Sequence, residues 1–241
     1  MFRALPEGYV DLDRGRWRVV APRIELREMT DLIERVRGGE ALGEPAESGR
    51  GGARRVVLRG GKVVYVRPYR RGGLVRFLVR DLYLLRPPRP VRELEATERA
   101  RAAGCRVPIV QAVAVEERGL FYRGWIVTSA IDEARSLSAV MAEADETGRG
   151  ALLAAAGAAV RDLHEAGVYH RDLTGENLLV EGDGRVAVID FDRALVAPPG
   201  QQAMAARGLD RLWRSLRKAA AAGRFVLPEA ERRWLDRGYA R

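Results

Sequence analysis

Hydrophobic positions in the first half of the chain follow the spacing of β-strands. Apolar runs at residues 56–58 and 63–66 flank a pair of glycines, and this arrangement predicts a β-hairpin. Two further runs, at residues 110–115 and 122–128, have the length and composition of strands. We therefore expect a β-rich region in the first half of the chain.

Helical spacing prevails in the remaining segments. Large apolar residues recur there every three or four positions, which is the period of an amphipathic helix. The pattern predicts helices over residues 74–85, 91–103, 137–142, 151–166 and 205–222, a last short helix that begins at Pro228, and a weaker one near 26–36. A group of prolines ends the first of these helices, and Gly104 and Gly167 end the second and the fourth.

The charge balance of the chain favours an anionic partner. Of the 241 residues, 42 are Lys or Arg and 33 are Asp or Glu, which gives a net charge of +9. Such an excess suits a nucleotide, a nucleic acid, a phosphorylated glycolipid or an acidic membrane. An Arg-rich genome accounts for the excess equally well, because arginine is scattered along the whole chain.

Cysteine usage and hydropathy indicate a cytoplasmic protein. Cys105 is the only cysteine, so no intrachain disulfide can form. No run approaches the roughly 18 consecutive apolar residues of a membrane span. The first residues also lack the basic-then-apolar order of a secretory signal.

The motif that carries chemistry lies at residues 170–177, His-Arg-Asp-Leu-Thr-Gly-Glu-Asn. It fits the kinase catalytic-loop pattern H-R-D-L-x-x-x-N at every fixed position. Asp190, within Ile-Asp-Phe-Asp, follows after two apolar runs joined by a Gly-Asp-Gly turn. That turn predicts a hairpin, which would return Asp190 to the neighbourhood of Asn177.

Phosphoryl transfer needs this set of side chains. Mg²⁺ bridges nucleotide phosphates to the protein and prefers hard oxygen ligands, which Asn177 and Asp190 supply. Asp172 would accept the proton of the attacking hydroxyl and orient that hydroxyl. His170 is expected to pack beneath the loop and bond to backbone near Asp190, and His164 is given no role.

The motif and the element order predict an α+β, two-lobed, protein-kinase-like fold with a small β-rich N-lobe and a reduced helical C-lobe. Residues 1–47 would be an extension packed on the N-lobe, 48–130 the nucleotide-binding N-lobe, and 131–241 the C-lobe with the catalytic loop and the acceptor site. After Asp192 too little chain remains for a protein-kinase activation segment, and no A-P-E motif is present. A small-molecule or glycolipid acceptor therefore suits the chain better than a protein.

The N-lobe offers candidate nucleotide-binding groups. Backbone N–H groups could approach phosphates at three glycines, Gly49, Gly51 and Gly52. Arg67 stands where kinases have the lysine of V-A-I-K and would contact the α- and β-phosphates. Lys62 is a rival for that role, but its position at the hairpin turn favours a solvated side chain. The helix after the prolines would provide a carboxylate for Arg67: Glu93 is the choice, with Glu95 and Glu98 as rivals.

A resemblance to a known family covers most of the chain. Residues 66–74, Val-Arg-Pro-Tyr-Arg-Arg-Gly-Gly-Leu, resemble the R-H-Y-R-R-G-G signature of the 3-deoxy-D-manno-octulosonic acid (Kdo) kinases, which belong to the lipopolysaccharide kinase family of Gram-negative bacteria. Similar layouts recur at Asp81-Leu82-Tyr83, Arg89–Glu93, Val107-Pro108, Ser136-Leu137, Val168–His170 and Ile189–Arg193. The resemblance runs from about Gly49 to Leu216, and it also supports Glu93 as the partner of Arg67.

The resemblance implies a substrate and a location. Such enzymes use ATP and Mg²⁺ to phosphorylate a Kdo hydroxyl of the lipid A–Kdo precursor, in lipopolysaccharide core biosynthesis at the cytoplasmic face of the inner membrane. Arg70 and Arg71 would then face the glycolipid or the anionic membrane surface, and Asp192 is assigned to acceptor binding. Arg171, Thr174 and Pro68 depart from the residues usual in the family, which leaves the acceptor sugar open.

Two alternatives stay open beside this interpretation. A kinase of the same fold could act on another small molecule or on a protein. A basic pseudokinase or nucleic-acid-binding module is compatible with the positive charge. The chain has no nucleic-acid motif and contains all three predicted phosphoryl-transfer residues, Asp172, Asn177 and Asp190, so we expect no nucleic-acid partner. The oligomeric state is left open.

Overall fold

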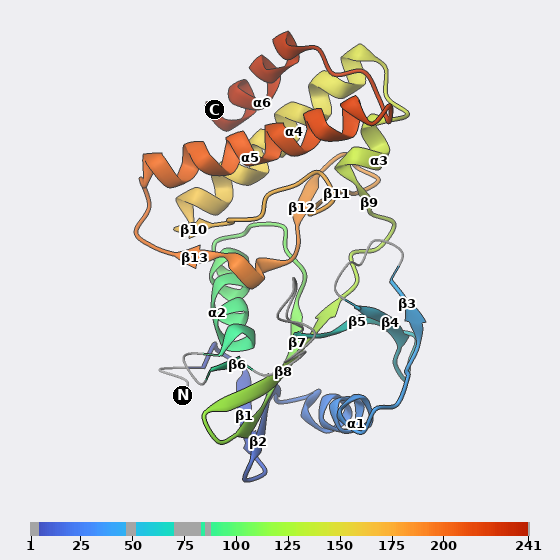
Figure 1. Cartoon of the computed structure of the whole chain (residues 1–241), viewed down its shortest axis with the longest axis vertical. Coiled ribbons are helices and arrows are strands. Elements are labelled where there is room, and N and C mark those ends of the chain that lie inside the picture. Colours follow the sequence, from blue (N-terminus) through green and yellow to red (C-terminus); the bar gives the residue numbers. More distant parts are fainter. Residues whose placement is uncertain (1–4, 47–51, 70–82, 85–87, 241) are drawn as a thin grey trace. The chain divides into compact units, whose positions relative to one another are not determined.

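The chain folds into two compact units. The computed structural model describes residues 5–46, 52–69, 83–84 and 88–240 (Figure 1). Unit 1 comprises Met1–Glu98 and Ile109–Ala130, and unit 2 comprises Arg99–Pro108 and Ile131–Arg241. No helix in the described ranges combines the length and apolar character needed to cross a membrane.

Unit 1 is built on an antiparallel sheet of eight strands in its described part. The strand order is β1-β2-β7-β8-β5-β4-β3, and β6 pairs with β8. The bounds are β1 (Tyr9–Asp13), β2 (Trp17–Pro22), β3 (Glu44–Pro45), β4 (Arg54–Val57), β5 (Val63–Pro68), β6 (Tyr83–Leu84), β7 (Val110–Arg118) and β8 (Phe121–Ser129). The predicted hairpin is β4–β5, and the two further predicted strands are β7 and β8.

Alternating residues of the sheet cover its two faces. Val19 and Ala21 of β2 share an apolar cluster with Ile33 of α1 (Leu26–Arg37), whereas Val20 belongs to a second cluster with Leu94 of α2 (Arg89–Ala102). Successive strand residues point to opposite faces, so the two helices pack on opposite sides of the sheet. The second cluster fixes the first turns of α2, which carry Glu93.

Two segments of unit 1 differ from the sequence expectation. Residues 9–22, to which the pattern assigned no strand, form β1 and β2 within the sheet. The helix predicted over 74–85 is wrong at Tyr83 and Leu84, which form β6 and pair with Tyr122 and Phe121. Cross-strand pairing outweighs a short stretch of helical spacing there. The rest of that predicted helix, residues 74–82 and 85, lies outside the described residues.

Unit 2 is mainly helical. It contains α3 (Leu137–Met141), α4 (Glu146–Glu165), α5 (Gln202–Ala221), the 3₁₀ turn η3 (Glu229–Glu231) and α6 (Arg232–Ala240). Helix α4 packs on both α5 and α6 (Figure 1). Gly157 lets α4 and α6 approach closely, since a Cβ there would lie 2.2 Å from the carbonyl oxygen of Leu235. These helices form the base on which the loops of unit 2 rest.

Helix boundaries depart from prediction at α2 and α4. Helix α2 begins at Arg89, so that Pro90 lies in its first turn, where a missing N–H costs little. Helix α4 begins at Glu146 because the Asp145 side chain accepts a hydrogen bond of 2.7 Å from the backbone N–H of Gly148. Glycines in its first turns hide this start from the hydrophobic pattern.

Candidate active site

Two short strand pairs frame the predicted catalytic loop in unit 2. On one side, β10 (Val168–Tyr169) pairs with β13 (Leu195–Val196), and on the other β11 (Leu178–Val180) pairs with β12 (Val186–Val188). The loop at 170–177 and the segment at 189–194 therefore run between the same two pairs. Strand β9 (Arg135–Ser136) extends the β11–β12 sheet, and its Ser136 caps α3.

Backbone hydrogen bonds bring Asn177 and Asp190 together. The N–H of Ile189 donates to the carbonyl oxygen of Asn177 at 3.0 Å, so Asp190 follows directly on the bonded position. The side-chain amide nitrogen of Asn177 donates to the Asp172 carbonyl oxygen at 2.9 Å. The predicted return of Asp190 to Asn177 is thus present, and one amide connects Asn177 with Asp172.

His170 has the structural position expected for it. Its Nδ1 accepts from the Asp172 N–H at 3.2 Å, and its Nε2 lies 3.1 Å from the Ile189 carbonyl oxygen, to which it donates as the neutral Nε2–H tautomer. The ring meets Phe191 edge-on at 5.3 Å between centroids. Burial lowers the pKa of His170, which favours this neutral form. His170 therefore ties the catalytic loop to the segment that carries Asp190.

Asp190 adopts a backbone conformation that is rare for its type. Its φ is +64° and its ψ +68°, the left-handed region, and it precedes the 3₁₀ turn η2 (Phe191–Arg193). A residue with a Cβ in this region carries about 1–2 kcal/mol of strain. Such strain persists where the surroundings fix it and is frequent at functional sites. The Asp190 residue is exposed, which leaves it accessible to ligands.

Arg211 of α5 binds Asp172, the predicted base. Its Nε lies 2.9 Å from Asp172 Oδ1, and its Nη2 contacts the same oxygen. The side chains remain 43% and 31% exposed, respectively. Among the described residues the other carboxylate oxygen, Oδ2, has no hydrogen-bond partner. Asp172 is thus held through one oxygen and open at the other.

Helix α5 supports the loop at further points that sequence reasoning missed. The Gly175 N–H donates to Ser215 Oγ at 3.3 Å, and Arg224, just after the helix, pairs with Glu176 at 2.8 Å. A Cβ at Gly175 would lie only 2.8 Å from a methyl carbon of Leu216, so helix and loop touch directly. The sequence shows the helical spacing of α5, but nothing in it indicates which polar residues meet the loop.

Arg67 and Glu93 form a pair within unit 1. Arg67 Nη2 donates to both carboxylate oxygens of Glu93 at 2.7 Å. The Tyr69 hydroxyl also donates to Glu93, and the Arg67 guanidinium stacks over the Tyr69 ring at 5.0 Å. Of the rivals, Glu98 instead accepts from Tyr9, and Glu95 is exposed. The structure therefore contains the pairing chosen from the sequence, and its role toward nucleotide stays a prediction.

The structure describes only two of the remaining predicted residues, Gly52 and Asp192, and their roles stay predictions. Gly52 is exposed with a φ of +71°, whereas Gly49, Gly51, Arg70 and Arg71 lie outside the described residues. Asp192 lies in η2, half-buried.

Lys62 is exposed at the hairpin turn, as expected, and its ammonium group also has protein partners. Its Nζ contacts Glu25, which precedes α1, and donates to Gln111 Oε1 of β7 at 2.7 Å. This ammonium group is bound by the protein itself.

The chemistry of Asn177 and Asp190 fits a hard cation. The Asn177 amide uses its nitrogen on Asp172, and its oxygen has no protein partner among the described residues. Together with the exposed Asp190 carboxylate it offers the oxygen ligands that Mg²⁺ prefers. Over the described ranges, no three His, Cys, Asp or Glu side chains form a metal-binding group, so waters and phosphate oxygens would have to complete the coordination.

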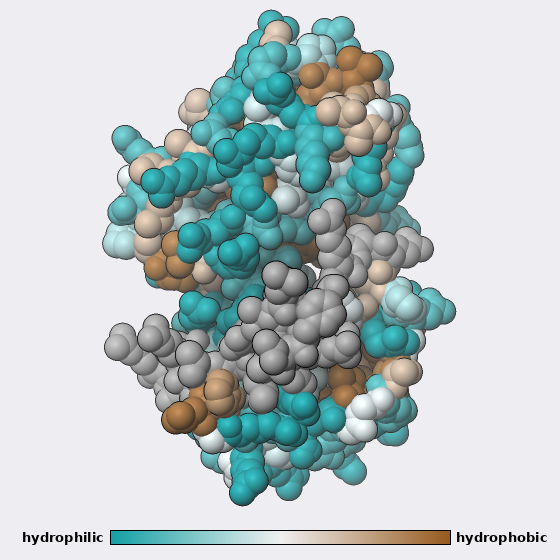
Figure 2. All heavy atoms as spheres, in the orientation of Figure 1, coloured by the Kyte–Doolittle hydropathy of each residue, from teal (hydrophilic) through white to brown (hydrophobic). Residues whose placement is uncertain are grey.

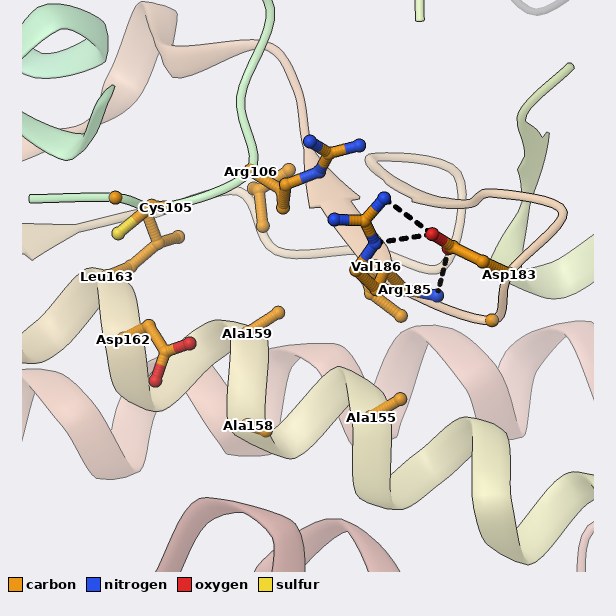
Figure 3. A pocket seen from close by; sticks show the side chains of 13 residues that line it. Cys105, Arg106, Ala155, Ala158, Ala159, Asp162, Leu163, Asp183, Arg185 and Val186 are labelled. Atoms are coloured by element: carbon orange, nitrogen blue, oxygen red, sulfur yellow. Dashed lines mark hydrogen bonds and ion pairs between the residues drawn. The ribbon is translucent and has the colours of Figure 1, made fainter. Parts of the chain in front are cut away.

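A separate hollow in unit 2 contains none of the predicted site residues. It has a volume of about 320 Å³ and lies between α4 and the β11–β12 hairpin (Figure 3). Cys105 lines it, and burial raises the pKa of that thiol to about 11. Since the thiolate is the reactive form, this cysteine is a poor nucleophile.

The arrangement of strands and helices defines the chain as kinase-like. A solved structure, WaaP in complex with acyl carrier protein, has the same fold with a TM-score of 0.58 and 23% sequence identity, over 86% of each chain. The framed loop with its H-R-D-L-x-x-x-N motif belongs to that class of fold.

Sequence relatives define the family. The model of the lipopolysaccharide kinase (Kdo/WaaP) family matches residues 35–239. A 3-deoxy-D-manno-octulosonic acid kinase of Stenotrophomonas maltophilia is 34% identical over 209 residues, 85% of this chain and 82% of the relative. Its counterpart in Xanthomonas campestris pv. campestris is 33% identical with the same coverage. The chain therefore belongs to the lipopolysaccharide kinase (Kdo/WaaP) family, and the predicted family, kinase-like fold and phosphotransferase class are confirmed.

Proposed function

We propose that this protein transfers the γ-phosphoryl group of ATP to a Kdo hydroxyl of the lipid A–Kdo precursor, on the cytoplasmic face of the inner membrane. The observation that carries the proposal is the framed loop of unit 2. It connects Asp172 to Asn177 by one hydrogen bond and Asn177 to the Asp190 segment by another. Family membership and the names of the relatives support the acceptor.

Each site residue has a defined task in this proposal. Asp172 Oδ2 accepts the proton of the Kdo hydroxyl as the new O–P bond forms and the bond from the γ-phosphorus to ADP breaks. Asn177 and Asp190 would hold Mg²⁺, which neutralises phosphate charge when bound. Arg67, fixed by Glu93, would contact the α- and β-phosphates. Gly49, Gly51 and Gly52 would approach the phosphates, and Arg70, Arg71 and Asp192 would bind the acceptor.

Positioning explains why so few groups suffice. Phosphoryl transfer needs an aligned hydroxyl and a stabilised phosphate charge, and little covalent chemistry from the protein. The buried His170 and the backbone bonds of Ile189 hold the loop in one conformation. The Asp172 and Asp190 carboxylates are therefore presented to substrates on a fixed frame.

An acceptor assay with labelled ATP tests the proposal. We expect Mg²⁺-dependent transfer of label to Kdo-lipid A and none to lipid A without Kdo. Asp172→Asn should lower turnover by about 10²–10⁴-fold, because the proton acceptor is lost, while nucleotide binding persists. Asp183→Asn is the matched control, since it removes an exposed carboxylate at the β11–β12 turn of the same unit. Label on another acceptor only would reject Kdo as the substrate, and normal turnover of Asp172→Asn would reject the base assignment.

A further inference from the structure

One cation that no motif includes reaches the proposed active site. Arg211 lies in the middle of α5 and binds Asp172 Oδ1 through Nε and Nη2. Its third nitrogen, Nη1, has no protein partner in the described part of the chain, and neither has Asp172 Oδ2. Within the described residues, the pair thus offers one donor and one acceptor that the protein does not use.

The position of Arg211 is fixed by the helix that carries it. One turn further along α5, Ser215 accepts from the loop at Gly175. Leu209, Leu212 and Leu216 are buried on the apolar side of the same helix. The face of unit 2 visible in Figure 2 is largely hydrophilic, and the Arg211 side chain is 43% exposed. Arg211 is therefore anchored at its backbone, and its side chain is partly accessible to solvent.

Stability does not explain this ion pair. A pair between two partly exposed side chains is worth about 0–1 kcal/mol, because solvent screens it and two side chains lose freedom. The pair instead constrains the Asp172 carboxylate, because Nε and Nη2 of Arg211 both bind Oδ1 and thereby fix the direction of Oδ2. A guanidinium is also suited to bind a second carboxylate through its remaining N–H groups, as its donors form a rigid planar fork.

We propose that Arg211 is a positioning and specificity residue, which fixes Asp172 through Oδ1 and binds the carboxylate of a sugar-acid acceptor through Nη1. The inference rests on the proposed function, in which the acceptor is an octulosonic acid and so carries a carboxylate. By binding the acid group, Arg211 places the reacting hydroxyl at Asp172 Oδ2. A neutral sugar would lack this contact, so the same residue selects for the acid.

The test is a double comparison of enzyme and acceptor with the full chain, ATP and Mg²⁺. The acceptors are Kdo-lipid A and an analogue whose Kdo carboxylate is converted to a neutral amide. The wild type should lose about 10- to 100-fold in kcat/KM on the amide, the effect of one charge-assisted hydrogen bond. On Kdo-lipid A, the kcat/KM of Arg211→Ala should be lower than that of the wild type by about the same factor or more, with the KM for ATP unchanged. For this variant, the change from Kdo-lipid A to the amide should lower kcat/KM only a little further. Arg211→Lys should restore part of the loss.

Arg217→Ala is the matched control, because Arg217 lies on α5 and, among the residues that the structure describes, pairs only with exposed Glu229, at 3.4 Å. It should behave as the wild type, and thermal midpoints of all variants should agree. If the change from Kdo-lipid A to the amide lowers kcat/KM for Arg211→Ala as much as it does for the wild type, the proposed contact with the carboxylate is wrong. Unchanged activity of Arg211→Ala would reject both roles. A wild type inactive on Kdo-lipid A would instead reject the proposed function, and this inference with it.

Discussion

The two units hold the carboxylates of the proposed site in opposite surroundings. In unit 1, Glu93 is 3% exposed and accepts hydrogen bonds from Arg67 and Tyr69. In unit 2, Asp190 is exposed, and Asp172 has one oxygen without a partner among the described residues. The protein itself occupies the Glu93 carboxylate, whereas Asp172 keeps one oxygen open and Asp190 lies at the surface. Glu93 should therefore serve structure, and Asp172 and Asp190 chemistry.

The largest effect should come from Asp190. We expect Asp190→Asn to lower turnover by roughly 10³-fold, because the site would lose a charged ligand for the Mg²⁺ that stabilises the charge of the transferred phosphoryl group. Asparagine tolerates the left-handed backbone, so the strain at this position hardly changes. Mg²⁺ titration of the acceptor assay measures the effect on chemistry, and a thermal melt measures the effect on stability.

Glu133 provides the matched control for Asp190. It is the other non-glycine residue with a positive φ in the described ranges, +50°, and it is exposed. Glu133→Asn removes a carboxylate from the same kind of backbone in the same unit and should leave turnover unchanged. If Asp190→Asn melts unit 2 while its remaining folded fraction turns over normally, Asp190 is structural and the comparison fails.

Glu93 should show the reverse behaviour. Glu93→Ala leaves the Arg67 guanidinium without its carboxylate, which should cost about 3 kcal/mol of unit 1 stability. Hydrogen exchange followed by mass spectrometry can report each unit separately. Glu95→Ala, an exposed carboxylate on the same helix, should change stability by less than about 0.5 kcal/mol. Unchanged exchange in Glu93→Ala would show that the buried pair contributes nothing to the fold.

Local patterns predicted the parts of the molecule that are formed by neighbours in sequence. The hairpins β4–β5 and β11–β12 and the approach of Asp190 to Asn177 follow from turn residues and motif spacing. The partners of Asp172 were not predictable, because Arg211 is 39 residues away and shares no motif with it. Strand β6 was missed for the same reason: it exists only through pairing with β8. Long-range contacts of this kind leave no period in the sequence.

The smallest expected effect concerns acid stability, in which the units should also differ. Both histidines of the chain lie in unit 2, and each is buried. His164 stacks on Tyr169 at 5.0 Å, and its Nδ1 lies 3.0 Å from the Tyr239 hydroxyl. Burial lowers the pKa of His164 to about 4, with a smaller contribution from His170. The unfolded chain therefore binds this proton more readily than the folded one.

The sign of the pH dependence follows from that difference. An unfolded histidine titrates near pH 6.5. Above this pH, His164 is neutral in both states and costs no stability. As the pH falls toward 4, the unfolded chain binds the proton and the folded one does not, so the free energy of unfolding declines. At pH 5 the loss from His164 amounts to about 2 kcal/mol. Hydrogen exchange at pH 7.5 and 5.0, corrected for the intrinsic exchange rates, should show unit 2 losing more protection than unit 1. His164→Gln should remove about that part of the decline, because glutamine does not titrate but can still bond to Tyr239. Equal losses in both units, or an unchanged decline in His164→Gln, would mean that the carboxylates and not the buried imidazole control acid unfolding.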